Sequence, residues 1–212
     1  MSEEQRRVST TKAEILRCTE QGDFQCVHTY SGIQIEPNEW IIEACEEAKR
    51  SVKEGGGPFG AVLVQMDDKN GDVIRFWKGR NHVAEHNDPT AHAEISVIRS
   101  ACRDLGVYDL GKISAEKGRS LHSGTTSHCE LYSSCEPCPM CFSAILWARI
   151  PVLVFSATRY EASRPDVGFA DGDIYEELRR EYADRSIRVQ QSICACTMDP
   201  FEDWKRSDNL RY

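Results

Sequence analysis

The chain lacks features that would direct it to a membrane or to a polyanion. None of its 212 residues belongs to an apolar run near the roughly 20 residues that a membrane span needs. The N-terminus opens with charged residues and has no apolar stretch, so we expect no secretory signal peptide. The net charge is −8, whereas nucleic-acid-binding proteins usually present a basic face. We therefore expect neither a membrane nor a nucleic-acid partner.

The chain contains ten cysteines, which is a high number for its length. An even number is compatible with disulfides. However, no secretory signal precedes them, and two of them are better used as thiolate metal ligands. We therefore expect a reducing compartment, the cytoplasm. The other eight are expected to be small buried apolar residues or free thiols.

Length and composition are those of an ordinary globular protein. Apolar residues make up 40% and charged residues 28%, and the length suffices for one well-buried α/β domain. Residues 1–36 are polar and weakly patterned, and we expect an N-terminal extension without an assignable role. Residues 37–212 are expected to form the domain itself.

Hydrophobic periodicity predicts alternating helices and strands from residue 37 onward. Asn38 is placed to cap a helix that ends at Gly55–Gly57, and two strands follow, joined by an Asn70-Gly71 turn. Further helices are predicted at 87–105, 138–147, 172–183 and 199–206, further strands at 129–133, 151–157 and 186–192, and a polar surface loop at 113–128. This order predicts a three-layer α/β/α domain around a mixed sheet.

One imidazole and two thiols have the spacing of a catalytic zinc site. His92 lies at the start of a predicted helix, and Cys138 and Cys141 lie at the start of another. Pro139 favours the first helical turn, and the helix N-terminus favours thiolates. Catalytic zinc takes three protein ligands and leaves a fourth position for water. We therefore predict His92, Cys138 and Cys141 as ligands of Zn²⁺.

The sequence alone is also compatible with other roles for these cysteines. Cys135 and Cys138 form an overlapping C-x-x-C pair, but Cys135 precedes Pro137 and has no helix terminus behind it. A C-x-x-C pair could also be a redox dithiol or half of a structural zinc site, which would need a fourth ligand at suitable spacing. Cys194 and Cys196 have the wrong spacing for a zinc knuckle.

Glu94 follows the predicted imidazole ligand by two residues. A glutamate early in a helix is often only a favourable charge against the helix dipole. At this spacing it can also reach the water on the ion without binding the ion. It would then move that water's proton to a ring nitrogen and to the leaving amine. The order H-x-E…P-C-x-x-C is the signature of the zinc deaminases that act on nucleobases.

Three longer segments extend this pattern: Gly57–Val62, Asn87–Glu94 and Ser134–Cys141. Together they resemble the cytidine-deaminase superfamily and, more narrowly, its guanine deaminase branch, which converts guanine to xanthine and ammonia. The resemblance runs from about residue 37 to the C-terminus and is interrupted at 113–128. It implies the cytidine-deaminase-like α/β fold, Zn²⁺ as cofactor and a small purine as substrate.

The resemblance also implies substrate contacts. Asn81 matches an asparagine that hydrogen-bonds the purine, and Phe59 and Trp147 would line the pocket, although both could simply be core aromatics. Asp171 matches an aspartate that contacts the base and helps to move protons. The family has Gly-Phe-Asp-Asp where this chain has Ala170 before Asp171, which leaves Asp173 as the alternative.

The resemblance to this branch implies that the chain forms a homodimer in which the C-terminal segment, residues 197–212, is exchanged between the two subunits. In that arrangement Tyr212 would close the partner's pocket, whereas its simpler role is that of a frayed terminal residue.

Several rival functions share these motifs. A guanosine deaminase, or a deaminase of another amino-substituted azaheterocycle such as a pterin or triazine, would use the same metal chemistry. A pocket closed by Trp147 and Tyr212 leaves less room for a ribose and favours the free base. A tRNA adenosine deaminase is disfavoured by the acidic charge balance, and a non-catalytic zinc-binding module by the complete set of predicted ligands.

Overall fold

The computed structural model describes residues 27–118, 124–169 and 171–211. By its internal contacts the chain divides into two units, residues 1–172 and residues 173–212. Within the described ranges, no helix combines the length and the apolar character that crossing a membrane requires.

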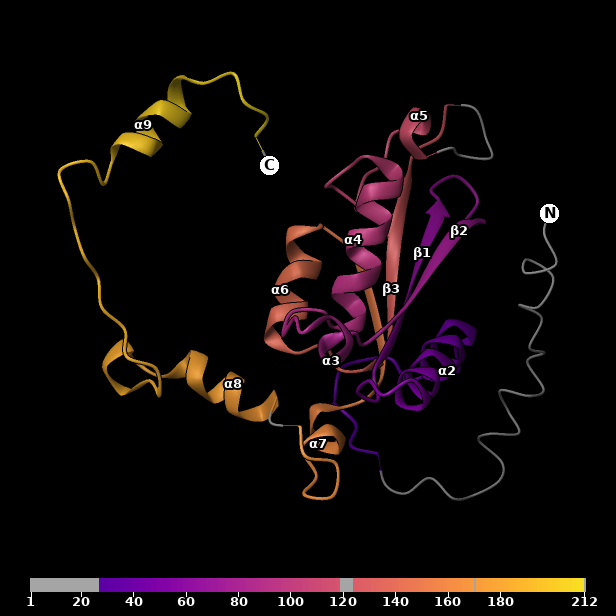
Figure 1. Ribbon diagram of the computed structural model, residues 1–212. Helices are drawn as coiled ribbons and strands as arrows, with labels where there is room; N and C mark the ends of the chain where they lie inside the picture. Colours follow the sequence, from indigo (N-terminus) through magenta and orange to yellow (C-terminus); the bar gives the residue numbers. More distant parts are fainter. Residues whose placement is uncertain (1–26, 119–123, 170, 212) are drawn as a thin grey trace. The chain divides into compact units, whose positions relative to one another are not determined.

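A mixed four-stranded sheet forms the centre of the first unit (Figure 1). Its strands, in spatial order, are β2 (Val73–Arg80), β1 (Gly60–Asp67), β3 (Ser127–Cys135) and β4 (Val152–Ala157). β1 pairs antiparallel with both of its neighbours, and β3 pairs parallel with β4. The hairpin between β1 and β2 turns through Gly71 at φ +73°, in the region where glycine is favoured, as the Asn-Gly signal predicts.

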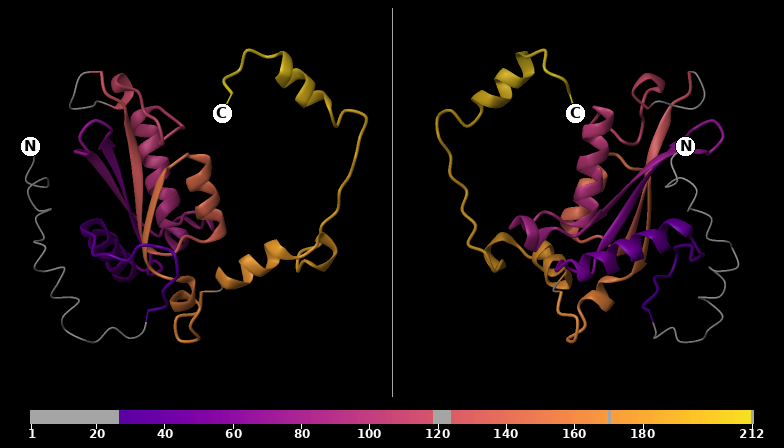
Figure 2. Two further views of the ribbon diagram at one scale, coloured as in Figure 1. Left: turned by 180° about the vertical axis from the view of Figure 1, so that it is seen from behind. Right: turned by 45° about the vertical axis from the view of Figure 1, so that its right-hand side comes forward.

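Helices cover both faces of this sheet. α2 (Glu39–Lys53) lies on one face, while α4 (Ala93–Leu105) and α6 (Pro139–Trp147) lie on the other (Figures 1 and 2). α2 begins as predicted, because the Asn38 side chain accepts hydrogen bonds from the amides of Trp40 and Ile41 at 2.9 and 3.3 Å. The three-layer α/β/α architecture is confirmed.

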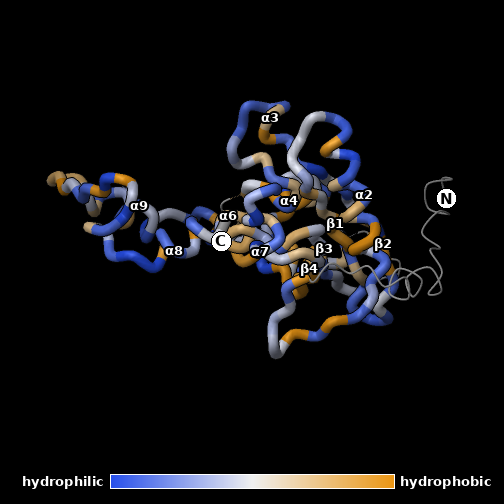
Figure 3. Tube along the Cα trace, turned by 90° about the horizontal axis from the view of Figure 1, so that it is seen from below, coloured by the Kyte–Doolittle hydropathy of each residue, from blue (hydrophilic) through white to orange (hydrophobic). Residues whose placement is uncertain are grey.

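Alternation along the buried strand β1 divides its side chains between two cores. Figure 3 shows the course of the chain coloured by the hydropathy of each residue. Ala61 and Leu63 face the α4 and α6 side, where they pack in one cluster with residues such as Val97. Val62 and Val64 face the other side and pack with Trp40 of α2. Because α4 and α6 share one core, their N-terminal ends are held at the same edge of the sheet.

Two sequence predictions in this unit require correction. The helix expected to open at residues 87–90 begins only at Ala93, because Asn87 at φ +50° caps a separate short helix, α3 (Val83–His86). The 113–128 segment is not wholly a loop. It contains α5 (Ala115–Gly118), and its last residues belong to β3, where Ser127 pairs with Asp67. A further short helix among the described residues of this unit is α7 (Arg159–Ala162).

The second unit begins within α8 (Asp171–Arg179) and continues through a 3₁₀ turn, η2 (Tyr182–Asp184), to α9 (Asp199–Arg206). The predicted terminal helix at 199–206 is confirmed. The strand predicted at 186–192 is wrong, since these residues carry no regular structure. An alternating pattern favours a strand, but a strand also needs a neighbour for its backbone hydrogen bonds.

Candidate metal centre

Two helix N-termini meet at the predicted metal ligands. His92 is the N-terminal capping residue of α4, and Cys138 is that of α6, with Pro139 in the first helical position. Cys141 lies in the first turn of α6. The exposed amides at both helix ends carry partial positive charge, which favours sulfur in its thiolate form.

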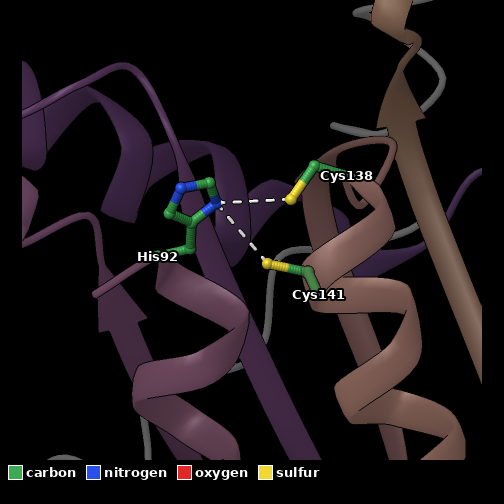
Figure 4. Close-up of side chains that lie close together, drawn as sticks. All are labelled: His92, Cys138 and Cys141. Atoms are coloured by element: carbon green, nitrogen blue, oxygen red, sulfur yellow. Dashed lines mark hydrogen bonds between the residues drawn. The ribbon is translucent and has the colours of Figure 1, made fainter. Parts of the chain in front are cut away.

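The three side chains point toward one another (Figure 4). His92 Nδ1 lies 3.6 Å from Cys138 Sγ and 3.5 Å from Cys141 Sγ. Tetrahedral zinc with ordinary Zn–N and Zn–S bonds separates its nitrogen and sulfur ligands by about 3.6 Å. The donor atoms therefore have both the chemical character and the spacing that zinc requires, with three protein ligands as in a catalytic site.

The two sulfurs differ in acidity. The neighbouring Cys141 side chain and His92 together lower the pKa of Cys138 to about 4. The Cys138 side chain and burial raise the pKa of Cys141. Cys135, the competing ligand, is placed differently. It lies in β3 and its Sγ is 3.6 Å from the carbonyl oxygen of Thr158, so it is not part of the cluster.

Glu94 is buried against this cluster, with 6% of its surface exposed. Its two carboxylate oxygens accept hydrogen bonds from Ser133 Oγ at 3.3 Å and from Cys141 Sγ at 3.5 Å. Burial raises the pKa of the Glu94 carboxyl above its usual range, because desolvation disfavours the charged form. A carboxyl group in this position can both accept and return a proton.

A cavity of about 510 Å³ opens onto these residues. His92, Glu94 and Cys138 contribute to its wall, together with two further residues singled out from the sequence, Phe59 and Asn81. The volume is within the roughly 300–1,000 Å³ range of small-molecule sites. The cavity therefore brings together the cluster and two of the expected substrate contacts.

Asn81 and Phe59 present complementary surfaces to this cavity. Asn81 Oδ1 accepts a hydrogen bond from the Val83 amide at 3.2 Å, which leaves the side-chain NH₂ as the donor for a ligand. Phe59 packs edge-to-face against Phe169, with ring centroids 4.7 Å apart, and both rings line the cavity. Aromatic walls of this kind suit a flat heterocycle.

Trp147 does not line this cavity, contrary to the expectation from the sequence. It is the last residue of α6, and at about 1.5 Å per residue it lies about 13 Å along the helix from Cys138. Its side chain is 71% exposed and borders a separate shallow pocket with Ser143 and Leu146.

The expected roles of the Asp171 side chain and of Tyr212 lie outside the described residues. Asp173, the alternative, is an exposed residue of α8.

The structure adds residues that sequence reasoning missed. Glu136 lines the cavity, and its carboxylate accepts hydrogen bonds from Tyr30 Oη at 2.8 Å and from Arg159 Nη1 at 2.9 Å. Its place inside the Cys135–Cys141 motif was a signal that could have identified it. Phe169 and Ser133 carried no comparable signal, because only the folded chain brings them to the site.

Comparison with known proteins agrees with this geometry. Residues 35–157 match the family described as the cytidine and deoxycytidylate deaminase zinc-binding region. The chain is 39% identical to guanine deaminase of Bacillus subtilis (strain 168) over 81% of this chain and 92% of that protein. It is 40% identical to the tRNA-specific adenosine deaminase of Aquifex aeolicus (strain VF5), over 54% of this chain and 61% of that protein. The X-ray structure of guanine deaminase from Bacillus subtilis is similar, with a TM-score of 0.67 at 36% identity over 84% of this chain and 99% of that chain.

Proposed function

Because the chain belongs to the cytidine and deoxycytidylate deaminase family, we propose that it is a zinc-dependent enzyme that hydrolyses guanine to xanthine and ammonia. The observation that carries this proposal is the meeting of Glu94 with His92, Cys138 and Cys141 at the wall of one cavity. The extended similarity to a guanine deaminase supports the choice of substrate.

His92, Cys138 and Cys141 would hold the ion. When bound, zinc lowers the pKa of a coordinated water to about 7 and so supplies a nucleophile at neutral pH. Glu94 accepts a proton from the attacking water and delivers it to the adjacent ring nitrogen. It then takes the remaining proton from the new hydroxyl group on the attacked carbon, which becomes a carbonyl, and gives that proton to the amine, which departs as ammonia. Ser133, which donates to Glu94 Oε1, holds the carboxylate in the direction of the cavity.

Substrate recognition would come from other residues that line the cavity. Asn81 offers its side-chain NH₂ to an acceptor on the purine, since its oxygen is already used by the Val83 amide. Phe59 and Phe169 would pack against the planar ring. We assign Asp171 a second proton-handling and base-contacting role on the family resemblance alone.

A tRNA substrate fits the chain less well. The similarity to tRNA-specific adenosine deaminases is 40% identity over 54% of this chain or 31% over 76% of it, against 39% over 81% for the guanine deaminase. The net charge of −8 also disfavours a polyanion. The choice between guanine and guanosine rests on the similarity to guanine deaminase, because Trp147 lies away from the cavity and gives no steric argument against a ribose.

The finer proposals concern assembly and compartment. α6 exposes the apolar side chains of Phe142, Leu146 and Trp147, which are 45%, 61% and 71% exposed, and such a patch is typical of an interface. We propose a homodimer in which the 197–212 segment is exchanged and Tyr212 closes the partner's cavity.

Cytoplasmic residence suits Cys138 and Cys141, which must stay reduced to bind metal.

The proposal is tested by replacing Glu94 with glutamine. This change preserves the shape of the side chain but removes its ability to carry a proton. We expect zinc content equal to that of the wild type and a fall in kcat of at least ~10²-fold. Zinc is measured by mass spectrometry and turnover by ammonia release. Unchanged kcat would exclude Glu94 as the proton carrier.

A further inference from the structure

A second cluster of metal-binding side chains lies on and just before the short helix α3. His82, Glu85 and His86 each offer one ligand atom within 4.8 Å of the other two. His82 Nδ1 lies 2.9 Å from Glu85 Oε2, and His86 Nε2 lies 4.0 Å from Glu85 Oε1. Ligands of a tetrahedral zinc ion with Zn–N and Zn–O bonds of ordinary length are about 3.4 Å apart. Small rotations of exposed side chains would reach that spacing.

Local structure holds the two imidazoles side by side. His82 and His86 are four residues apart, so one helical turn brings them to the same side. Their rings stack with centroids 4.8 Å apart and planes 6° from parallel. Their side chains are 23% and 55% exposed, so water can fill the remaining coordination positions of an ion.

We propose that His82, Glu85 and His86 form a second metal site, which binds a divalent transition-metal ion of the zinc and nickel class. Two imidazoles and one carboxylate are ligands that such ions favour. The site is solvent-facing and has no thiolate, so it is weaker than the centre at His92 and is filled only when metal is in excess.

Arg80 moderates this affinity. Its guanidinium contacts Glu85 Oε2 at 2.8 Å and also Glu54 Oε2 at 2.7 Å. Binding of a cation therefore competes with Arg80 for Glu85, but Arg80 keeps Glu54 as a partner when Glu85 turns to the ion. The competition is a second reason to expect weak binding.

The location of this site connects it to the cavity. Val83 and Ala84, which lie between the two histidines, belong to the cavity wall, and the Val83 amide donates to Asn81. An ion bound by His82 and His86 would fix the one-turn helix that forms this part of the wall.

The test is a Zn²⁺ titration of protein that already carries one zinc per chain, followed by equilibrium dialysis and metal analysis. We expect the wild type to take up one further equivalent. His86→Ala and Glu85→Gln should each weaken that second binding at least ~10-fold, the lower end of what loss of even an outer-shell partner costs a metal site. The first equivalent should remain in both variants. The NMR resonances of the His82 and His86 rings should shift together as the second equivalent binds.

His128→Ala is the matched control, because His128 also faces two carboxylates, Asp68 at 2.6 Å and Glu130 at 3.5 Å, but at a different place on the chain. It should retain the second equivalent. Wild-type protein that takes up no further zinc at millimolar free metal would overturn the proposal. So would a second equivalent that survives in both the His86 and Glu85 variants.

Discussion

At the scale of single residues, the identity of the metal ligands depends on where each thiol sits relative to a helix end. Cys138 and Cys141 lie at the N-terminus of α6 and face His92 Nδ1, whereas Cys135 lies in β3 and contacts the Thr158 carbonyl. The overlapping C-x-x-C pairs are therefore not equivalent, although their sequence spacing is the same.

Serine substitutions test which of the two pairs, Cys138/Cys141 or Cys135/Cys138, binds the zinc ion. We expect Cys141→Ser to lose most bound zinc and all activity, because it removes one of three ligands. Cys135→Ser should keep one zinc per chain, since a serine hydroxyl can still donate to Thr158. The measurement is the zinc content of the purified variants, and circular dichroism verifies that both are folded. Retained zinc in Cys141→Ser together with loss in Cys135→Ser would reverse the ligand assignment.

The meeting of His92, Cys138, Cys141 and Glu94 in one cluster was predictable because short-range sequence pattern determines it. Pro139 identifies a helix start, and that start fixes where Cys138 and Cys141 point. Glu136 was overlooked although it lies within the Cys135–Cys141 motif, whereas Phe169 was not predictable because its place in the wall depends on contacts between distant segments. The residues that hold Glu136, Tyr30 and Arg159, were not predictable either, because nothing in the local sequence indicates them.

At the scale of elements, the close packing of α2 on the start of β1 holds one layer of the domain in place. Gly60, the first residue of β1, lies directly against the backbone of α2. A Cβ there would overlap the Ala44 carbonyl and the Ala48 amide and would lie 2.7 Å from Glu47 Cβ. Only glycine fits without moving the helix away from the sheet.

Gly60→Ala should consequently lower the free energy of unfolding by about 1–3 kcal/mol, the usual cost of overpacking. Gly172→Ala in α8 is the control, because a Cβ there meets no atom within 4 Å, and alanine favours a helix. Urea denaturation of both variants gives the comparison. Equal stability of the two variants would show that α2 can shift without cost.

A helix or strand was predictable where the local sequence alone determines it. It was not predictable where its formation depends on contacts with another segment. Asn38 caps α2 through its own side chain, and α9 lies at the expected residues. The strand predicted at 186–192 is absent, although its pattern alternates, because pairing requires a second strand. The helix predicted from residue 87 begins instead at Ala93, since the left-handed Asn87 interrupts it.

At the scale of the whole molecule, α6 carries exposed apolar side chains, and this patch is the basis of the proposed dimer. Leu146 and Trp147 are 61% and 71% exposed, and Phe142 lies one turn earlier on the same helix. A second copy of the chain is the proposed cover for this patch.

Leu146→Glu should convert the dimer to single chains, because the substitution places a charge in an apolar interface. Val52→Glu is the control, since Val52 is 55% exposed on α2, on the opposite face of the sheet. Sedimentation equilibrium should give the dimer mass for the wild type and this control, and half that mass for Leu146→Glu. A wild-type chain that sediments as a monomer would remove the basis for an exchanged C-terminal segment.

Guanine as the substrate is tested by measuring ammonia release from a panel of amino heterocycles. Guanine, guanosine, adenine, cytosine, pterin and ammeline would be compared with the zinc-loaded enzyme, with the chelated enzyme and after zinc is restored. We expect guanine to give the highest kcat/KM and xanthine to be the product, and we expect activity to disappear with the metal and to return with it. Preference for another member of the panel, or full turnover of guanine by metal-free protein, would contradict this expectation.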